Sequence, residues 1–319
     1  MTVPRRLPLR RLVAGLLLLL VALAGAGLCA AVLTVGLRLA APANSMVGSP
    51  PTDLPGAEAV QIPSPSGSLL RGWWVAGKAP GGGAVVLMHG VWSNRRTMLQ
   101  RARVLHEQGF AVLLFDLQAH GESPGRHITF GRLEGLDAAV AVAFVRQRRP
   151  GERVGAIGVS LGGAAALLGP EPLPVDVLVL ESVYPDIDAA LANRLRAGLG
   201  PVAGPVLAPL LAPAFKLLLP PILGVRPDEL RPIDHIGAAT APLLVASGTA
   251  DDRTPISEAR FLFERAREPK QFWAVQGAAH VDLERYDPDA YWSVVLPILT
   301  RYLQGNAVRD LDIDRQSAP

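Results

Sequence analysis

The chain has 319 residues, of which 50% are hydrophobic and only 18% are charged. A chain of this length and composition can bury the core of one large α/β domain, which excludes an intrinsically disordered protein. The formal net charge of +3 is small, and no basic block is interleaved with aromatic residues, so nucleic-acid binding is not expected. The single cysteine, Cys29, excludes an intrachain disulfide and a zinc site built from cysteines.

The N-terminal region predicts a membrane-spanning helix. Residues 12–37 carry no charge, and as a helix they would extend about 39 Å, enough to cross a hydrocarbon core of about 30 Å. The preceding segment, residues 1–11, contains four arginines, so the positive-inside rule puts the N-terminus in the cytoplasm and the remainder outside. The alternative is a signal peptide cleaved at Ala41-Pro42-Ala43, giving a secreted protein. Because the apolar region of such signals is usually about 7–15 residues long, we favour the anchor.

Residues 38–56 are rich in Pro, Ser, Gly and Ala and predict a linker. A domain over residues 57–305 follows, beginning with a strand hairpin, and residues 306–319 are expected to form a flexible tail. Apolar strand-like runs then alternate with helical patterns. Unbroken apolar strands separated by helices indicate a parallel sheet covered by helices on both faces. The strands are expected at 57–62, 69–75, 84–88, 110–115, 154–159, 175–180, 242–247 and 271–275, and the helices at 97–108, 133–148, 161–168, 255–267 and 288–303.

One connection is much longer than the others. Residues 184–235 place about fifty residues between two strands, where a crossover usually needs about a dozen or fewer. The segment is dense in Leu, Pro, Ala and Val. It predicts either cap helices that pack on the domain or a lid with an apolar inner face. We favour a cap that also shapes a hydrophobic pocket.

A serine flanked by glycines follows the strand at 154–159. The run Gly158-Val159-Ser160-Leu161-Gly162, between a strand and a helix, is the context in which a nucleophilic serine stands on a sharp turn at the carboxyl end of a sheet. The same residues fit a helix N-cap serine in a glycine-rich turn. The interpretation therefore depends on a base and an acid elsewhere in the chain.

Among the six histidines, His280 is the best candidate base, because it lies in the loop QGAAHVDL between the last strand and the last helix. The strand at 242–247 ends in SGTADDRTP, which places Asp251 or Asp252 at the carboxyl edge of the sheet, where an acid could orient His280. The order serine, aspartate, histidine along the chain is that of the triad on α/β sheets of this kind.

Acyl transfer also needs two backbone N–H groups aimed at the oxyanion. Leu161 would supply one, and Val91, in the stretch MHGVWSNRR after the first parallel strand, would supply the other. Five further residues are expected to line the site: His89, Gly90, Trp92, Gly158 and Gly162. Arg95 and Arg96 are expected to be solvated, with an anionic headgroup as the alternative contact, and Trp73 and Trp74 are expected to pack.

From about Gly83 to Leu303 the sequence resembles the α/β-hydrolases, and within them the membrane-anchored bacterial serine hydrolases near the serine-aminopeptidase-like and monoacylglycerol-lipase-like group. The matching stretches are VVLMHGVWSNR, GFAVLLFDLQAHGESPG, VGAIGVSLGG, LLVASGTADDRTP and GAAHVDL.

The resemblance implies an eight-stranded, mostly parallel sheet with a cap after the sixth strand, a Ser160–His280–Asp251 triad, no cofactor and no metal. Asp251, unlike Asp252, matches the family's aspartate three residues after a glycine and four before a proline. Gln118 and Ala119 replace the arginine and glycine usual before HGxS, which is expected to alter loop packing.

These features predict a serine hydrolase, held at the membrane by its N-terminal helix, that cleaves ester or thioester bonds through an acyl-enzyme. The expected partners are the membrane and a small lipophilic acyl ester. Amide hydrolysis by a peptidase is one alternative. The other, from a different class, is a non-catalytic membrane-tethered binding protein on a hydrolase fold.

Overall fold

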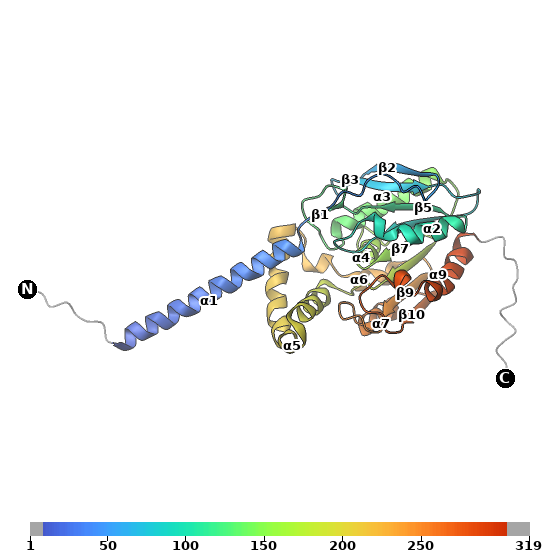
Figure 1. Cartoon of the computed structure of the whole chain (residues 1–319). Helices are drawn as coiled ribbons and strands as arrows, with labels where there is room; N and C mark the ends of the chain where they lie inside the picture. Colours follow the sequence, from blue (N-terminus) through green and yellow to red (C-terminus); the bar gives the residue numbers. More distant parts are fainter. Residues whose placement is uncertain (1–8, 305–319) are drawn as a thin grey trace, which may run out of the picture.

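The computed structural model describes residues 9–304 (Figure 1). Most of the predicted basic segment 1–11 and the whole of the predicted tail 306–319 lie outside the described residues.

An eight-stranded sheet forms the centre of the domain. β3 pairs antiparallel with both β2 and β5, and every other pair of neighbours in this sheet is parallel. The predicted mostly parallel sheet of eight strands is therefore confirmed. Its strand order is β10-β9-β8-β7-β4-β5-β3-β2, and the strands are β2 (Ala57–Pro63), β3 (Leu69–Val75), β4 (Ala84–Met88), β5 (Ala111–Phe115), β7 (Val154–Val159), β8 (Val177–Glu181), β9 (Leu243–Gly248) and β10 (Lys270–Val275).

Helices cover both faces of this sheet because alternate side chains of each strand enter different cores. In β4, Val86 belongs to one core while Val85 and Leu87 belong to the other. The helices α3 (Arg132–Arg148), α4 (Leu161–Leu167) and α7 (Ile256–Arg265) pack on the first core, and α2 (Leu99–Glu107), α8 (Leu283–Tyr286) and α9 (Pro288–Leu303) pack on the second. A short 3-10 helix, η1 (Arg95–Met98), precedes α2. Trp73 and Trp74 are buried, as predicted, and they lie in different cores.

The N-terminal helix α1 (Leu9–Leu39) projects away from the domain (Figure 1). Its stretch Val13–Leu39 has a mean hydropathy of 2.8, so it is long and apolar enough to cross a membrane. The last turns of α1 contact the domain, where Val32 is buried.

The segment predicted as a linker, residues 38–56, packs against the domain. Within it, β1 (Ala43–Asn44) forms a small parallel sheet with β6 (His120–Gly121). Val47 and Leu54 are buried in the core on the α2 side. We call residues 43–54 the strap.

The cap follows β8, the sixth strand of the sheet, as predicted. It consists mainly of α5 (Ile187–Leu223), which is broken at Gly200, where φ is 79° and ψ is 179°. The break produces two arms joined in a V (Figure 1). Short helical turns, η2 (Pro227–Glu229), α6 (Pro232–His235) and η3 (Ile236–Ala238), lead back to β9.

Candidate active site

Ser160 stands on the sharp turn between β7 and α4, with φ 50° and ψ −107°. This left-handed φ is unfavourable for a residue with a side chain, so the surrounding packing has to maintain it. The flanking glycines permit that packing. A Cβ on Gly158 would lie 2.6 Å from the Cα of Gly163, and one on Gly162 would lie 2.4 Å from the carbonyl oxygen of Met88. Gly158 and Gly162 therefore pack behind the turn and do not line the cleft, which corrects the expectation that they would line the site.

His280 and Asp251 come together from the loops after β10 and β9. Nδ1 of His280 lies 2.9 Å from Oδ2 of Asp251. The Asp251 carboxylate also accepts hydrogen bonds from the backbone N–H groups of Arg253 and Thr254 and from the Thr254 hydroxyl. Asp252, the other aspartate considered, is exposed.

These hydrogen bonds determine the charge of Asp251. Burial alone would raise the pKa of its carboxyl, but the bonds from His280 and Thr254 outweigh this effect and hold the pKa below its ordinary value. An ionised carboxylate at this position favours the His280 tautomer with a proton on Nδ1. The other ring nitrogen, Nε2, is then left as a proton acceptor.

Ser160 and His280 line the same cleft, which has a volume of about 770 Å³. No hydrogen bond joins their side chains among the bonds formed within residues 9–304. Contacts between a nucleophile and its base often tighten only when substrate binds. Three exposed arginines, Arg96, Arg253 and Arg285, also line the cleft, giving its wall a basic character.

The loop after β4 passes directly beside Ser160. A Cβ on Gly90 would lie 3.8 Å from that of Ser160. Gly90, Val91 and Trp92 line the cleft. In the described part of the chain, no protein acceptor is bonded to the backbone N–H groups of Val91 and Leu161.

The cap contacts two residues that line this cleft, Trp92 and Arg253. Trp92 has a φ of 56° and is 43% exposed, and the guanidinium of Arg194, from the first arm of α5, lies 4.7 Å from its ring centroid. Asn193, one residue earlier, donates hydrogen bonds to the carbonyl oxygen of Arg253 and to the carboxylate of Glu258. The first arm of α5 thus contacts both the loop after β4 and the loop that carries Asp251.

His89 lies beneath the loop after β4 and is fully buried, which corrects the expectation that it lines the site. Its Nδ1 lies 2.7 Å from the carbonyl oxygen of Gly90, and its Nε2 accepts the N–H of Leu117. Burial, together with the neighbouring His120, lowers the pKa of His89 to about 3. His89 is therefore uncharged at neutral pH, and its hydrogen bonds hold the loop after β4 in position.

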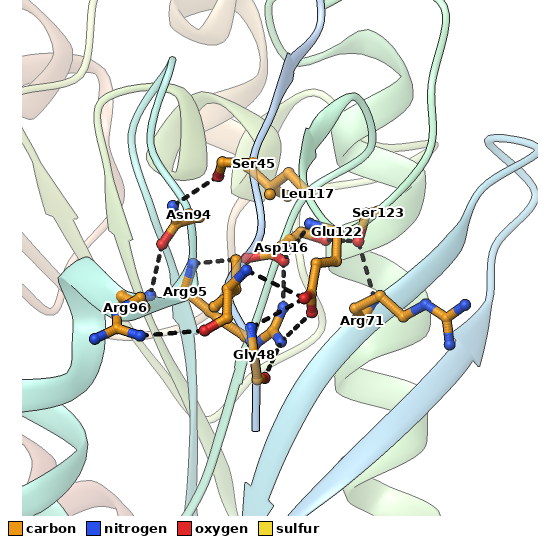
Figure 2. Close-up of polar contacts among 12 residues, drawn as sticks. Ser45, Gly48, Arg71, Asn94, Arg95, Arg96, Asp116, Leu117, Glu122 and Ser123 are labelled. Carbon is orange, nitrogen blue, oxygen red and sulfur yellow. Dashed lines mark hydrogen bonds and ion pairs between the residues drawn. The ribbon is translucent and has the colours of Figure 1, made fainter. Parts of the chain in front are cut away.

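Arg95 is buried, so the prediction of a solvated side chain was wrong. Figure 2 shows its guanidinium between the carboxylates of Asp116, with which it forms an ion pair, and of Glu122, 2.6 Å away. The backbone N–H of Arg95 also donates to Asp116, at 2.7 Å. A buried arginine needs such partners, and neither is adjacent in the sequence. Arg96, by contrast, is exposed, as predicted.

The same cluster attaches the strap to the loop after β4 (Figure 2). One oxygen of Glu122 accepts the N–H groups of Val47 and Gly48, at 3.1 and 2.9 Å. Arg96 donates to the carbonyl oxygen of Val47, and Asn94 donates to the hydroxyl of Ser45. The hydrogen bonds from the Arg95 side chain and the strap backbone lower the pKa of Glu122 to about 2.

A second buried ion pair, not predicted from the sequence, lies behind the site. Arg101 of α2 contacts Glu181 and Asp282, each at 2.8 Å, and donates to the hydroxyl of Tyr291. Glu181 accepts the backbone N–H of Ser160 through its carbonyl oxygen, and Asp282 follows His280 by two residues. Arg101 therefore connects the serine turn to the histidine loop. The available signal was an arginine within the otherwise apolar buried face of an amphipathic helix.

Within residues 9–304, no group of three His, Cys, Asp or Glu side chains is arranged to hold a metal ion.

Comparison with known proteins agrees with this architecture. Residues 80–217 match the family model described as serine aminopeptidase, S33. The chain is 30% identical to the uncharacterized protein Rv2307c of Mycobacterium tuberculosis over 268 residues, which cover 84% of this chain and 86% of that protein. It is also 34% identical over 142 residues to the thiohydrolase aneE of Aspergillus aculeatus, covering 43% of this chain and 44% of that enzyme.

Among solved structures, the esterase Pf2001 of Pyrococcus furiosus superposes with a TM-score of 0.66 at 25% identity, over 82% of this chain and 99% of that one. The shared sheet, the sequence relatives and the serine turn lead to one conclusion: the chain belongs to the α/β-hydrolase superfamily.

Proposed function

We propose that this protein is a membrane-anchored serine hydrolase that cleaves ester bonds through an acyl-enzyme formed on Ser160. The observation that carries the proposal is the 2.9 Å contact between His280 and Asp251 in the cleft that also contains Ser160 on its strained turn. The similarity to an esterase and to a thiohydrolase supports ester and thioester substrates.

In the proposed mechanism, Nε2 of His280 accepts the hydroxyl proton of Ser160 as Oγ attacks the acyl carbonyl carbon. The backbone N–H groups of Val91 and Leu161 then stabilise the oxyanion, each contributing about 3 kcal/mol to lowering the barrier. His280 returns the proton to the departing alcohol. Water, deprotonated by the same histidine, hydrolyses the acyl-enzyme and regenerates Ser160.

The N-terminal helix would hold the enzyme at a bilayer. The stretch Val13–Leu39 is long enough to cross it, and the four arginines that precede this stretch favour a cytoplasmic N-terminus with the hydrolase domain on the opposite side. An enzyme in this position meets lipophilic acyl esters, and the apolar cleft residues Val91, Trp92 and Leu99 could contact an acyl chain.

The test is covalent labelling of the full-length protein in detergent with a fluorophosphonate, followed by identification of the modified residue. We expect labelling in the wild type and in Ser182→Ala, and none in Ser160→Ala. Ser182 is an informative comparison, because it lines the same cleft and also has a φ of 50°. Retained labelling in a folded Ser160→Ala protein would refute the proposed nucleophile.

The match to a serine-aminopeptidase family model keeps amide hydrolysis as a second candidate function. The two are separated by comparing kcat/KM for p-nitrophenyl butyrate with that for aminoacyl-p-nitroanilides. The proposed esterase should prefer the butyrate, whereas a preference for the anilides would favour the peptidase. Absence of both activities from a folded protein would favour a binding function.

A further inference from the structure

The second arm of α5 exposes an apolar face. Val202, Val206, Leu210 and Leu217 are 86%, 64%, 71% and 76% exposed. Their spacing places them within one sector of the helix surface. From Arg196 to Lys216 the intervening chain contains only Gly, Ala, Val, Leu, Pro and Phe. The arm therefore has no polar side chain over most of its length.

The opposite face of this arm is the one that packs on the protein. Gly204, Ala208, Phe215 and Leu219 are buried there. A helix on the surface of a soluble protein carries polar residues on its outer face, whereas a helix that is apolar all round belongs in a protein core or in lipid. The buried face of this arm already packs on the protein, whereas its outer apolar face is not covered by other described residues. An exposed apolar face of this kind usually marks a surface that contacts lipid or another protein.

The position of α1 identifies that partner. A Cβ on Gly36 of α1 would lie 3.1 Å from a methyl group of Leu218 and 3.8 Å from the ring of Phe215, so the last turns of α1 contact the second arm. Figure 1 shows the V of α5 pointing away from the sheet on the side from which α1 leaves the domain. From Leu218 back to Val202 the arm extends about 24 Å beyond this contact.

The length of α1 is compatible with this arrangement. The apolar stretch Val13–Leu39 has 27 residues and extends about 40 Å, which exceeds a hydrocarbon core of about 30 Å. The excess allows the turns near Gly36 to lie at the membrane surface, where they meet α5. A bilayer crossed by α1 would therefore begin beside the second arm.

We infer that the outer face of the second arm of α5, formed by Val202, Val206, Leu210 and Leu217, inserts into the lipid leaflet at which α1 leaves the membrane. The inference rests on the membrane anchoring proposed above. Arg196 and Lys216 bracket the apolar run, as is favourable beside anionic headgroups, although Lys216 also contacts Asp188. The inserted element is the cap itself, whose first arm contacts the cleft residue Trp92 through Arg194.

The inference can be tested by the depth of a fluorophore in vesicles of phosphatidylcholine and phosphatidylglycerol. Full-length Cys29→Ala protein would carry Val206→Cys labelled with nitrobenzoxadiazole. The matched control is Ser293→Cys, at an exposed position of α9, and the positive control is Leu20→Cys, within α1. We expect a blue-shifted label at position 206 that is quenched by nitroxides on the upper acyl chains, as for a face buried about 5–10 Å into the interface. The control at 293 should remain unquenched.

The outcomes distinguish insertion of α5 into lipid from membrane anchoring by α1, on which that inference rests. Quenching at position 20 but not at position 206 would overturn the inference and leave the anchor in place. Quenching at neither position would refute the anchor, and the inference with it. A blue shift at 206 without lipid quenching, accompanied by crosslinking between two copies through Val206→Cys, would identify a second copy as the partner and also overturn it. The readout needs no catalytic activity, so it is independent of the role of Ser160.

Discussion

Replacing Arg101 with methionine should be among the most destabilising substitutions of a residue that does not itself line the cleft. The side chains of Arg101 and Glu181 are fully buried and 2.8 Å apart. Removing one member of such a pair costs about 3–5 kcal/mol, because the other remains as a buried charge without a partner. Since 1 kcal/mol shifts the Tm of a domain of this size by about 2–4 °C, we expect Arg101→Met to lower Tm by roughly 10 °C.

The loss should depend on pH in a defined direction. Burial raises the pKa of Glu181 above its ordinary value, and the attraction of Arg101 opposes that rise, so Arg101→Met should raise this pKa further. A carboxyl whose pKa is higher in the folded state holds its proton more tightly there. The contribution of protonated Glu181 to the free energy of unfolding is therefore present below the pKa of the unfolded state. It is lost as the pH rises through the pKa of the folded state. The Tm deficit should therefore be small near pH 4 and largest above neutral pH.

Activity should fall in the same variant, because Arg101 also holds Asp282 beside the His280 loop. Displacement of that loop should reduce kcat about 10- to 100-fold for a soluble ester and change KM little. Thermal melts in detergent between pH 4 and pH 8 and p-nitrophenyl butyrate hydrolysis would measure both effects. Arg148→Met is the control, since its exposed pair with Glu58 is worth only about 0–1 kcal/mol. A Tm loss no greater than that of the control, or one that does not shrink in acid, would refute the reasoning.

Three further predictions concern the cleft and the strap. Asp251→Asn should lower kcat about 10⁴-fold with little change in Tm, because the amide favours the wrong His280 tautomer; a steady-state assay beside a thermal melt checks this. Glu122→Gln should lower Tm by about 2–4 °C at pH 7. Because the pKa of Glu122 is lowered from 4.5 to about 2 in the folded protein, its contribution is present above pH 4.5 and lost as pH falls toward 2, and the Tm difference should shrink over that window. Arg253→Gln should reduce kcat/KM for p-nitrophenyl hemisuccinate, which carries a carboxylate, more than for the neutral butyrate, because Arg253 is one of the basic residues lining the cleft.

The architecture could be predicted from the sequence where the signals were local. Unbroken apolar runs identified the central strands, and the carboxyl ends of parallel strands meet at one edge of a sheet. Asp251 and His280 follow two such strands, β9 and β10, so topology alone brings their loops together. The sequence could not show the hydrogen bonds from Thr254 that fix the carboxylate, since these depend on how the loop after β9 folds.

The buried charges were not predictable in the same way. Arg95 follows the loop formed by residues 89–94, and no charged partner is adjacent to it in the sequence. Its partners Asp116 and Glu122 lie after a different strand. His89 and His280 both occupy loops at the carboxyl edge of the sheet, yet packing places one beneath the loop after β4 and the other in the cleft. Whether such a side chain is buried or faces the cleft depends on contacts between segments far apart in the sequence, and neither composition nor periodicity predicts these contacts.

The strap supports the active site independently of α1, the proposed membrane anchor. A signal peptidase acting at Ala41-Pro42-Ala43 would cut ahead of the contacts that Glu122 and Arg96 make with Val47 and Gly48. The cut would remove the hydrogen bond from the N–H of Ala43 to Ala119, but it would leave the cluster around Arg95 complete. The loop that carries Val91 is thus held by residues that remain with the domain whether or not α1 does. In the proposed membrane arrangement, by contrast, the outer face of α5 depends on α1, because the contact of α1 with the second arm would place that face at a bilayer. Cleavage would therefore be expected to preserve turnover of soluble esters while selectively reducing turnover of esters embedded in vesicles.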